Sequence, residues 1–251
     1  MEIFKSSNPA LSESRFESQV QYADGEVMTR GGTLNKFFLL ALLVISSAAF
    51  TWSAAAQGKD VTMWMIGGAI GGLVLSLVTI FKPKIANITA PLYALCEGFF
   101  LGAISVFFAN AFAKSAPGIV MQAVGLTFGV VIAMYFLYKF NVIKATARLQ
   151  SIIVMSLGGI MVFYLISMVM GMVGVNLPFL ALGTPLSIGI ALFVVAIAAL
   201  SLIMDFEMIE QGVQSRAPKY MEWYGAFGLA VTIIFLYVSI LRLLANLSNR
   251  N

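Results

Sequence analysis

Three acidic residues near the end of an apolar stretch are the first candidates for chemistry in this chain. Asp205 lies at the end of the stretch 186–206, and Glu207 and Glu210 follow it before a polar turn. A carboxylate at the mouth of a membrane-spanning helix costs free energy, so its presence there favours a functional role. Acids in such a place can share protons, or hold a hard cation such as calcium, which prefers oxygen ligands.

Two further polar side chains fall inside apolar stretches. Glu97 lies seven residues after Ala90, where a helix is expected to begin, and a rise of about 1.5 Å per residue places it roughly 10 Å into the hydrocarbon. Such a carboxyl should face protein or water, or be protonated, and a neutral glutamic acid bonded to a neighbouring helix is an equally open interpretation. Thr232 lies ten residues after Glu222, which is roughly 15 Å along a helix and close to the midplane.

The composition indicates which class of protein positions these side chains. Of the 251 residues, 60% are apolar and 10% are charged, and the mean hydropathy is +0.94, whereas about a quarter of the residues in soluble domains are charged. A helix needs about 20 apolar residues to cross the bilayer. Seven stretches meet this requirement: 36–56, 62–81, 90–112, 118–138, 149–174, 186–206 and 223–245. Backbone groups in lipid must bond within their own segment, so the sequence predicts an all-α membrane protein with seven transmembrane helices embedded in a lipid bilayer.

The residue types that are missing exclude several kinds of site. There is no histidine, and Cys96 is the only cysteine, which excludes disulfides, thiolate zinc sites and histidine-based triads. An intramembrane aspartyl protease needs two membrane aspartates, and the apolar stretches contain one, Asp205. We therefore expect no enzymatic activity and no cofactor.

Basic residues predict the orientation. Eleven lysines and arginines lie in the tail, at its junction with the first helix, and in the loops 82–89, 139–148 and 205–222, against four on the other side. The positive-inside rule then places the amino terminus in the cytoplasm and, with seven spans, the carboxyl terminus outside. The net charge of +4 is explained by this distribution, so we expect no nucleic-acid partner. Residues 1–35 are predicted to form a polar cytoplasmic tail, and residues 36–251 the seven-helix transmembrane domain.

Glycines four residues apart occur in three of the predicted helices. Such spacing lets two helix backbones approach closely, either as fixed packing or as a smooth interface along which a helix slides. The glycines predicted to pack in this way are Gly67, Gly68, Gly71, Gly72, Gly98 and Gly102. Packing is also predicted for Gly225 and Gly228, which lie three residues apart on one face of the helix over 223–245.

Several fragments, in their order and spacing, together resemble one known family. They are MTRGGTLNKFFLLALLVISSAAFTW, PLYALCEGFFLGAIS, SLIMDFEMIEQG and FLYVSILRLL, and they are similar to the Bax inhibitor-motif (Bax inhibitor/YccA-like) membrane proteins, in a bacterial Bax inhibitor-like branch. The resemblance implies that the seventh helix is central between two three-helix layers, and that the protein resides in the bacterial inner membrane. It also implies a pH-sensitive calcium leak or channel, gated by two aspartates that share a proton when closed and repel each other when charged.

Carried over by position, this resemblance identifies one of the two gating aspartates. Asp205 matches the first, and the second falls at Thr232, which cannot ionise. Either Glu97 pairs with Asp205 to rebuild the carboxyl pair, or Asp205 and Thr232 form a simple hydrogen bond and the protein does not respond to pH. Asp205, Glu97 and Thr232 are thus the candidate calcium path or gate, with Glu207, Glu210 and Lys82 as secondary gate candidates.

The resemblance also implies a second function. Some YccA-like relatives bind a membrane protease, so the alternative to a cation leak is a regulator of membrane-protein quality control that binds a membrane protease through the tail 1–35.

Overall fold

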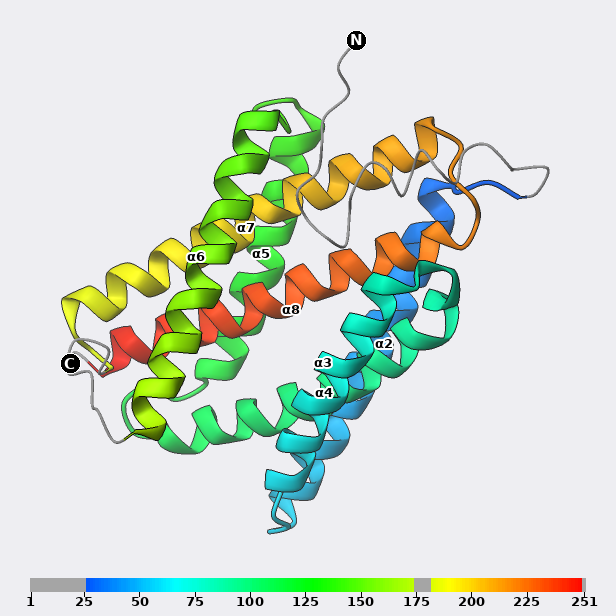
Figure 1. Cartoon of the computed structure of the whole chain (residues 1–251). Coiled ribbons are helices and arrows are strands. Elements are labelled where there is room, and N and C mark those ends of the chain that lie inside the picture. The colour runs from blue at the N-terminus through cyan, green and yellow to red at the C-terminus, as the bar shows by residue number, and fades with distance from the viewer. Residues whose placement is uncertain (1–25, 174–181, 250–251) are drawn as a thin grey trace. The chain divides into compact units, whose positions relative to one another are not determined.

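Long helices make up most of the described chain (Figure 1). The structure is a computed structural model, and it describes residues 26–173 and 182–249. The helices are α2 (Arg30–Ala56), α3 (Thr62–Phe81), the short 3₁₀ helix η1 (Pro83–Ile85), α4 (Ala86–Ala111), α5 (Ile119–Lys139), α6 (Ala147–Met172), α7 (Pro185–Gln214) and α8 (Met221–Ser248). The seven α-helices are long and apolar enough to cross a membrane, and the described residues contain no strand. The predicted all-α, seven-helix membrane architecture is confirmed.

Local sequence signals explain where several helices begin. The Thr29 hydroxyl accepts a hydrogen bond from the Gly32 N–H at the start of α2, and the Thr146 hydroxyl accepts one from the Leu149 N–H at the start of α6. Each threonine thereby satisfies one of the N–H groups that a first helical turn leaves without a partner.

Three helix boundaries differ from the sequence prediction. Helix α2 begins at Arg30, six residues before the expected stretch 36–56, and α7 continues nine residues beyond Asp205 to Gln214. Helix α4 begins at Ala86, four residues before the expected start at Ala90, and contains Pro91 in its interior. The expected start was wrong, because the turn at Pro83–Ile85 already sets the chain in helical conformation. Only the hydrogen bond to the Asn87 carbonyl is lost at Pro91, a cost that helices in membranes tolerate.

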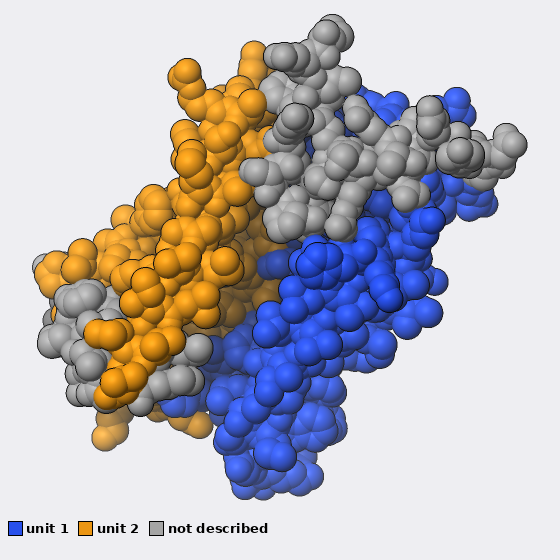
Figure 2. Space-filling view, viewed as in Figure 1, with its two compact units in different colours: residues 1–107, 205–231 blue, residues 108–204, 232–251 orange. Residues whose placement is uncertain are grey.

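The chain divides into two compact units (Figure 2). Unit 1 comprises residues 1–107 and 205–231, and unit 2 comprises residues 108–204 and 232–251. Helices α7 and α8 contribute residues to both units.

Unit 1 is held by close contacts between helix backbones. A Cβ atom added at Gly68 of α3 would lie 2.5 Å from the Cys96 carbonyl oxygen of α4. One added at Gly102 of α4 would lie 2.5 Å from the Ala48 carbonyl oxygen of α2. Helix α4 therefore packs tightly against both α2 and α3, and only glycine fits at these two crossings.

Unit 2 is joined at one end by polar contacts of Asn246 in α8. The Ser187 hydroxyl and the Gly183 N–H both donate to the Asn246 side-chain oxygen, at 2.7 and 3.3 Å. Asn246 is 1% exposed, so these hydrogen bonds are needed to satisfy a buried amide. They connect the end of α8 to the start of α7.

Large apolar side chains are exposed along the helices. Examples are Phe38, Met63, Phe81, Phe107 and Met121, each more than 60% exposed. Lipid acyl chains cover such surfaces without the free-energy cost that they would have in water.

Candidate functional site: buried carboxyls of unit 1

Asp205 is buried, and it is the first residue of α7 that belongs to unit 1. Its relative exposure is 8%, and it lies on the face of α7 that also carries Ser201 and Ile209, one turn before and one turn after it. Ser201 is buried too, and the Ile209 side chain lies 3.3 Å from a Cβ added at Gly225 of α8. Asp205 is therefore an interior acid of a membrane-spanning helix.

Glu97 is deeper along its helix than the sequence indicated. It lies eleven residues after Ala86, the observed start of α4, which is about 16 Å of rise and close to the middle of a hydrocarbon layer about 30 Å thick. Its side chain is half-buried against α3, where a Cβ added at Gly72 would lie 2.5 Å from Oε1. The absence of a side chain at Gly72 makes room for this carboxyl.

The aromatic residue one turn before Glu97 connects α4 to α8. Tyr93 is 3% exposed, and its ring packs edge-on against Phe227, with 4.9 Å between the ring centroids. Asp205 and Glu97 thus both belong to unit 1, each on a helix that contacts α8. Their direct pairing stays a prediction.

The other predicted gate residues differ in their surroundings. Thr232 is half-buried on α8 and belongs to unit 2. Glu207 accepts a hydrogen bond from the Gln211 side chain, and Glu210 forms an ion pair with Arg30. Lys82 is exposed at the end of α3. Within the described residues, no group of three or more His, Cys, Asp or Glu side chains is placed to hold a metal ion.

Only some of the other glycines predicted to pack lie against a neighbouring helix. Gly71 lies beside the Cys96 thiol, Gly98 lies against Val44 and Ser47 of α2, and Gly225 contacts Ile209. A Cβ added at Gly67 or Gly228 would meet nothing within 4 Å.

Sequence reasoning missed a second buried acid, Glu222 at the start of α8. Its side chain is fully buried, and it accepts hydrogen bonds from the Thr29 N–H at 2.9 Å and from the Thr29 hydroxyl at 2.8 Å. It also forms an ion pair with Lys36, and the Lys219 ammonium lies 3.8 Å away. We call Thr29, Lys36, Lys219 and Glu222 the Glu222 network.

The chain before α2 is fixed beside this network. The Met28 N–H donates to the Ala217 carbonyl at 2.7 Å, and the Lys219 N–H donates to the Glu26 carbonyl at 3.0 Å. These two bonds form an isolated antiparallel bridge centred on Val27 and Pro218. Residues 26–28 are thus bonded to the loop between α7 and α8.

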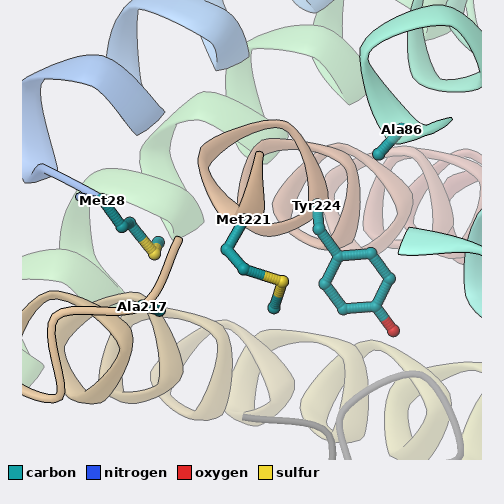
Figure 3. Packing of buried hydrophobic residues seen from close by; sticks show 5 residues of the cluster. All are labelled: Met28, Ala86, Ala217, Met221 and Tyr224. Carbon is teal, nitrogen blue, oxygen red and sulfur yellow. The ribbon is translucent and has the colours of Figure 1, made fainter. Parts of the chain in front are cut away.

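A small hydrophobic cluster includes Met28 and Ala217, the residues next to Val27 and Pro218 of the bridge (Figure 3). Its members are Met28, Ala86, Ala217, Met221 and Tyr224. Tyr220 packs against it, and burial raises the pKa of the Tyr220 phenol above its ordinary value.

The sequence carries only a weak signal for the Glu222 network. An acid in the first turn of a helix usually lies in solvent and interacts with the helix dipole. Its partner Lys36 is 186 residues away, so nothing in the local sequence indicates that the two side chains meet.

A comparison with protein families gives one match. The family model described as Bax inhibitor 1 like matches residues 8–249. Comparisons with curated proteins and with solved structures return no match.

Proposed function

The chain belongs to the Bax inhibitor 1-like family of membrane proteins, and from this premise we propose that it is a proton-sensitive cation leak. Calcium is the proposed ion, Asp205 is the gate carboxyl, and Glu97 is the second acid. In this proposal, ionised carboxyls attract cations to the pathway, and protonated ones do not. No enzymatic activity is part of the proposal.

The observation that carries this proposal is the burial of Asp205 inside a membrane-spanning helix. A carboxyl only 8% exposed in such a place costs several kcal/mol when ionised and unsupported, so it is retained for a role that apolar residues cannot fill. Glu97 repeats the arrangement near the middle of α4, within the same unit.

The charges of unit 1 favour cations over anions. The α-helical residues of this unit include five acids and two bases: Glu97, Asp205, Glu207, Glu210 and Glu222 against Arg30 and Lys36. The two bases form ion pairs with Glu210 and Glu222. An excess of carboxylates around a pathway raises the local concentration of cations.

Calcium flux into proteoliposomes that carry an internal calcium dye tests the proposal. Wild-type flux should rise as the pH is raised, because deprotonated carboxyls attract the ion. Asp205→Asn should remove most of the flux and its pH dependence, and Glu97→Gln should reduce both to a smaller extent. Asp60→Asn is the matched control, since Asp60 is exposed between α2 and α3 and the change is the same carboxyl-to-amide replacement.

Two results would contradict the proposal. One is wild-type flux no greater than that of empty vesicles at every pH. The other is an Asp205→Asn protein with the same pH profile as wild type. Thr232→Asp adds a gain-of-function arm, because it restores the acid that the family resemblance places there and should make the pH dependence steeper.

The proposed location is the inner membrane of a bacterium, with the amino terminus in the cytoplasm and the carboxyl terminus outside. The excess of lysine and arginine on the tail side supports this orientation. A reporter that is active only in the cytoplasm, fused after Asn251, should be silent, and activity of that fusion would reverse the assignment.

The bridge at residues 26–28 favours a second candidate function, a regulator that binds a membrane protease through its tail. The bridge bonds residues 26–28, which directly follow residues 1–25 of the tail, to the α7–α8 loop. Deletion of residues 1–25 should then abolish an effect on proteolysis of membrane proteins while calcium flux stays unchanged. An effect that survives the deletion would exclude this role for the tail.

A further inference from the structure

Unit 2 contains a pocket between α6, α7 and α8. Its volume is about 80 Å³, and its walls include Tyr164 of α6, Ala191 and Val194 of α7, and Phe235, Ser239 and Arg242 of α8. Arg242 is the only charged residue that lines it. The pocket is thus an apolar cavity with one fixed positive charge.

The guanidinium of Arg242 lies over the Tyr164 ring, with its Cζ atom 4.7 Å from the ring centroid. Arginine stays charged at any physiological pH. The aromatic face interacts with one face of the guanidinium, and the N–H groups in the guanidinium plane remain able to donate hydrogen bonds. The pocket can therefore offer several donors to an anion.

No carboxylate of unit 2 can pair with Arg242. Residues 108–204 and 232–251 contain no Asp and no Glu, and the four ion pairs of the described residues are all formed by residues of unit 1. A membrane-embedded arginine is stabilised by an anion, and here that anion has to come from outside the unit.

The position of Arg242 indicates which anion that is. Arg242 lies six residues before Ser248, the end of α8, or about 9 Å of helix rise. Its long stem lets the charged end reach the level of the lipid headgroups, where phosphate is the available anion. A zwitterionic headgroup would also bring an ammonium group, for which unit 2 has no carboxylate.

We propose that this pocket binds an anionic phospholipid, with the phosphate at Arg242 and Tyr164 and an acyl chain along Ala191, Val194 and Phe235. The charged group fixes the headgroup, and the apolar walls accept the chain. The site lies outside the carboxyls that carry the proposed ion leak, so it stands or falls independently of that function.

Lipid binding to the full-length protein in a neutral detergent tests the proposal. Native mass spectrometry and thermal unfolding would compare phosphatidylglycerol, phosphatidylcholine with the same acyl chains, and soluble glycerol phosphate. Wild type should bind phosphatidylglycerol about tenfold more tightly than phosphatidylcholine, the size expected for one charge-assisted contact. Arg242→Gln should lose that preference, and Arg242→Lys should keep part of it.

Lys139 provides a matched control in the same unit. Its ammonium lies 5.9 Å from the centroid of the Tyr135 ring, and it does not line the pocket. Lys139→Gln should keep the full lipid preference. Ala191→Leu fills the pocket wall and leaves Arg242 in place, so it should weaken binding even if Arg242→Gln does not fold.

Three results would overturn the proposal. They are an undiminished lipid preference in folded Arg242→Gln or undiminished lipid binding by Ala191→Leu, an equal loss of preference in Lys139→Gln, and binding of soluble glycerol phosphate as tight as that of the lipid. The second would indicate general charge attraction, and the third would indicate a soluble anion as the ligand.

Discussion

The two compact units are both built from apolar helices, but they differ in charge. All eleven acidic residues of the chain belong to unit 1, which also has nine lysines and arginines, whereas unit 2 has six basic residues and no acid. In unit 1, Glu210 and Glu222 are neutralised by bases of the same unit, Arg30 and Lys36. Unit 2 has no acidic side chain for its bases, and in the lipid proposal the anion for Arg242 comes from the bilayer. One chain thus uses two ways to place charge in a membrane.

The two units also differ in how glycines that are four residues apart are packed. Gly98 and Gly102 in unit 1 are four residues apart, as are Gly125 and Gly129 in unit 2. The first pair lies against the α2 backbone, whereas a Cβ added at either glycine of the second pair would meet nothing within 4 Å. Spacing therefore permits close helix packing but does not establish it.

The largest effect should come from breaking the Glu222 network. Lys36→Met would leave the fully buried Glu222 carboxylate without its main counter-charge and should lower the free energy of unfolding by about 3–5 kcal/mol. Unfolding in SDS, followed by circular dichroism, measures this change.

Two variants control for this prediction. Arg30→Gln removes an ion pair whose arginine side chain is 66% exposed, so its cost should stay below about 1 kcal/mol. Combining Lys36→Met with Glu222→Leu should recover much of the loss, because neither charge is then left buried. The prediction is contradicted if Lys36→Met and Arg30→Gln lower the free energy of unfolding equally. The contribution of an ion pair in unit 1 would then not depend on how deeply it is buried.

Smaller changes in stability, of opposite sign, are expected when a glycine of each unit is replaced by alanine. Gly102→Ala places a methyl group 2.5 Å from the Ala48 carbonyl oxygen and 2.8 Å from the Thr51 Cβ, and should destabilise by about 1–3 kcal/mol through overpacking. Gly129→Ala meets no such atom and should stabilise by about 0.5–1 kcal/mol, because alanine favours the helix. Thermal unfolding of both variants measures the two changes in stability. If both variants were stabilised, or both destabilised, the predicted difference between the two units would be contradicted.

The sequence predicted the helices well because twenty or so apolar residues in lipid have few alternatives to a helix. It also identified Asp205 and Glu97 as interior acids, since a carboxyl in an apolar stretch is conspicuous. The start of α4 was predicted four residues too late, at Ala90, because the proline that follows is of a type common at a first helical turn, and the preceding 3₁₀ turn is not visible in the composition.

Contacts between distant segments could not be predicted in this way. Glu222 resembles an ordinary acid at a helix start, and its burial depends on Thr29 and Lys36 at the other end of the chain. The room that Gly72 leaves for Glu97 likewise depends on how α3 and α4 cross. The pattern of a single sequence indicates where the helices are, but it does not indicate where two helices cross.

The Glu222 network also has a consequence for biosynthesis. Lys36 and Glu222 are separated by 186 positions, so Lys36 is synthesised long before its partner. Chains are synthesised from the amino terminus at about 5–20 residues per second, which leaves Lys36 without Glu222 for roughly ten seconds or more. The last helix thus supplies the carboxylate that pairs with a lysine of the first helix, and a chain truncated before α8 would carry Lys36 without this counter-charge.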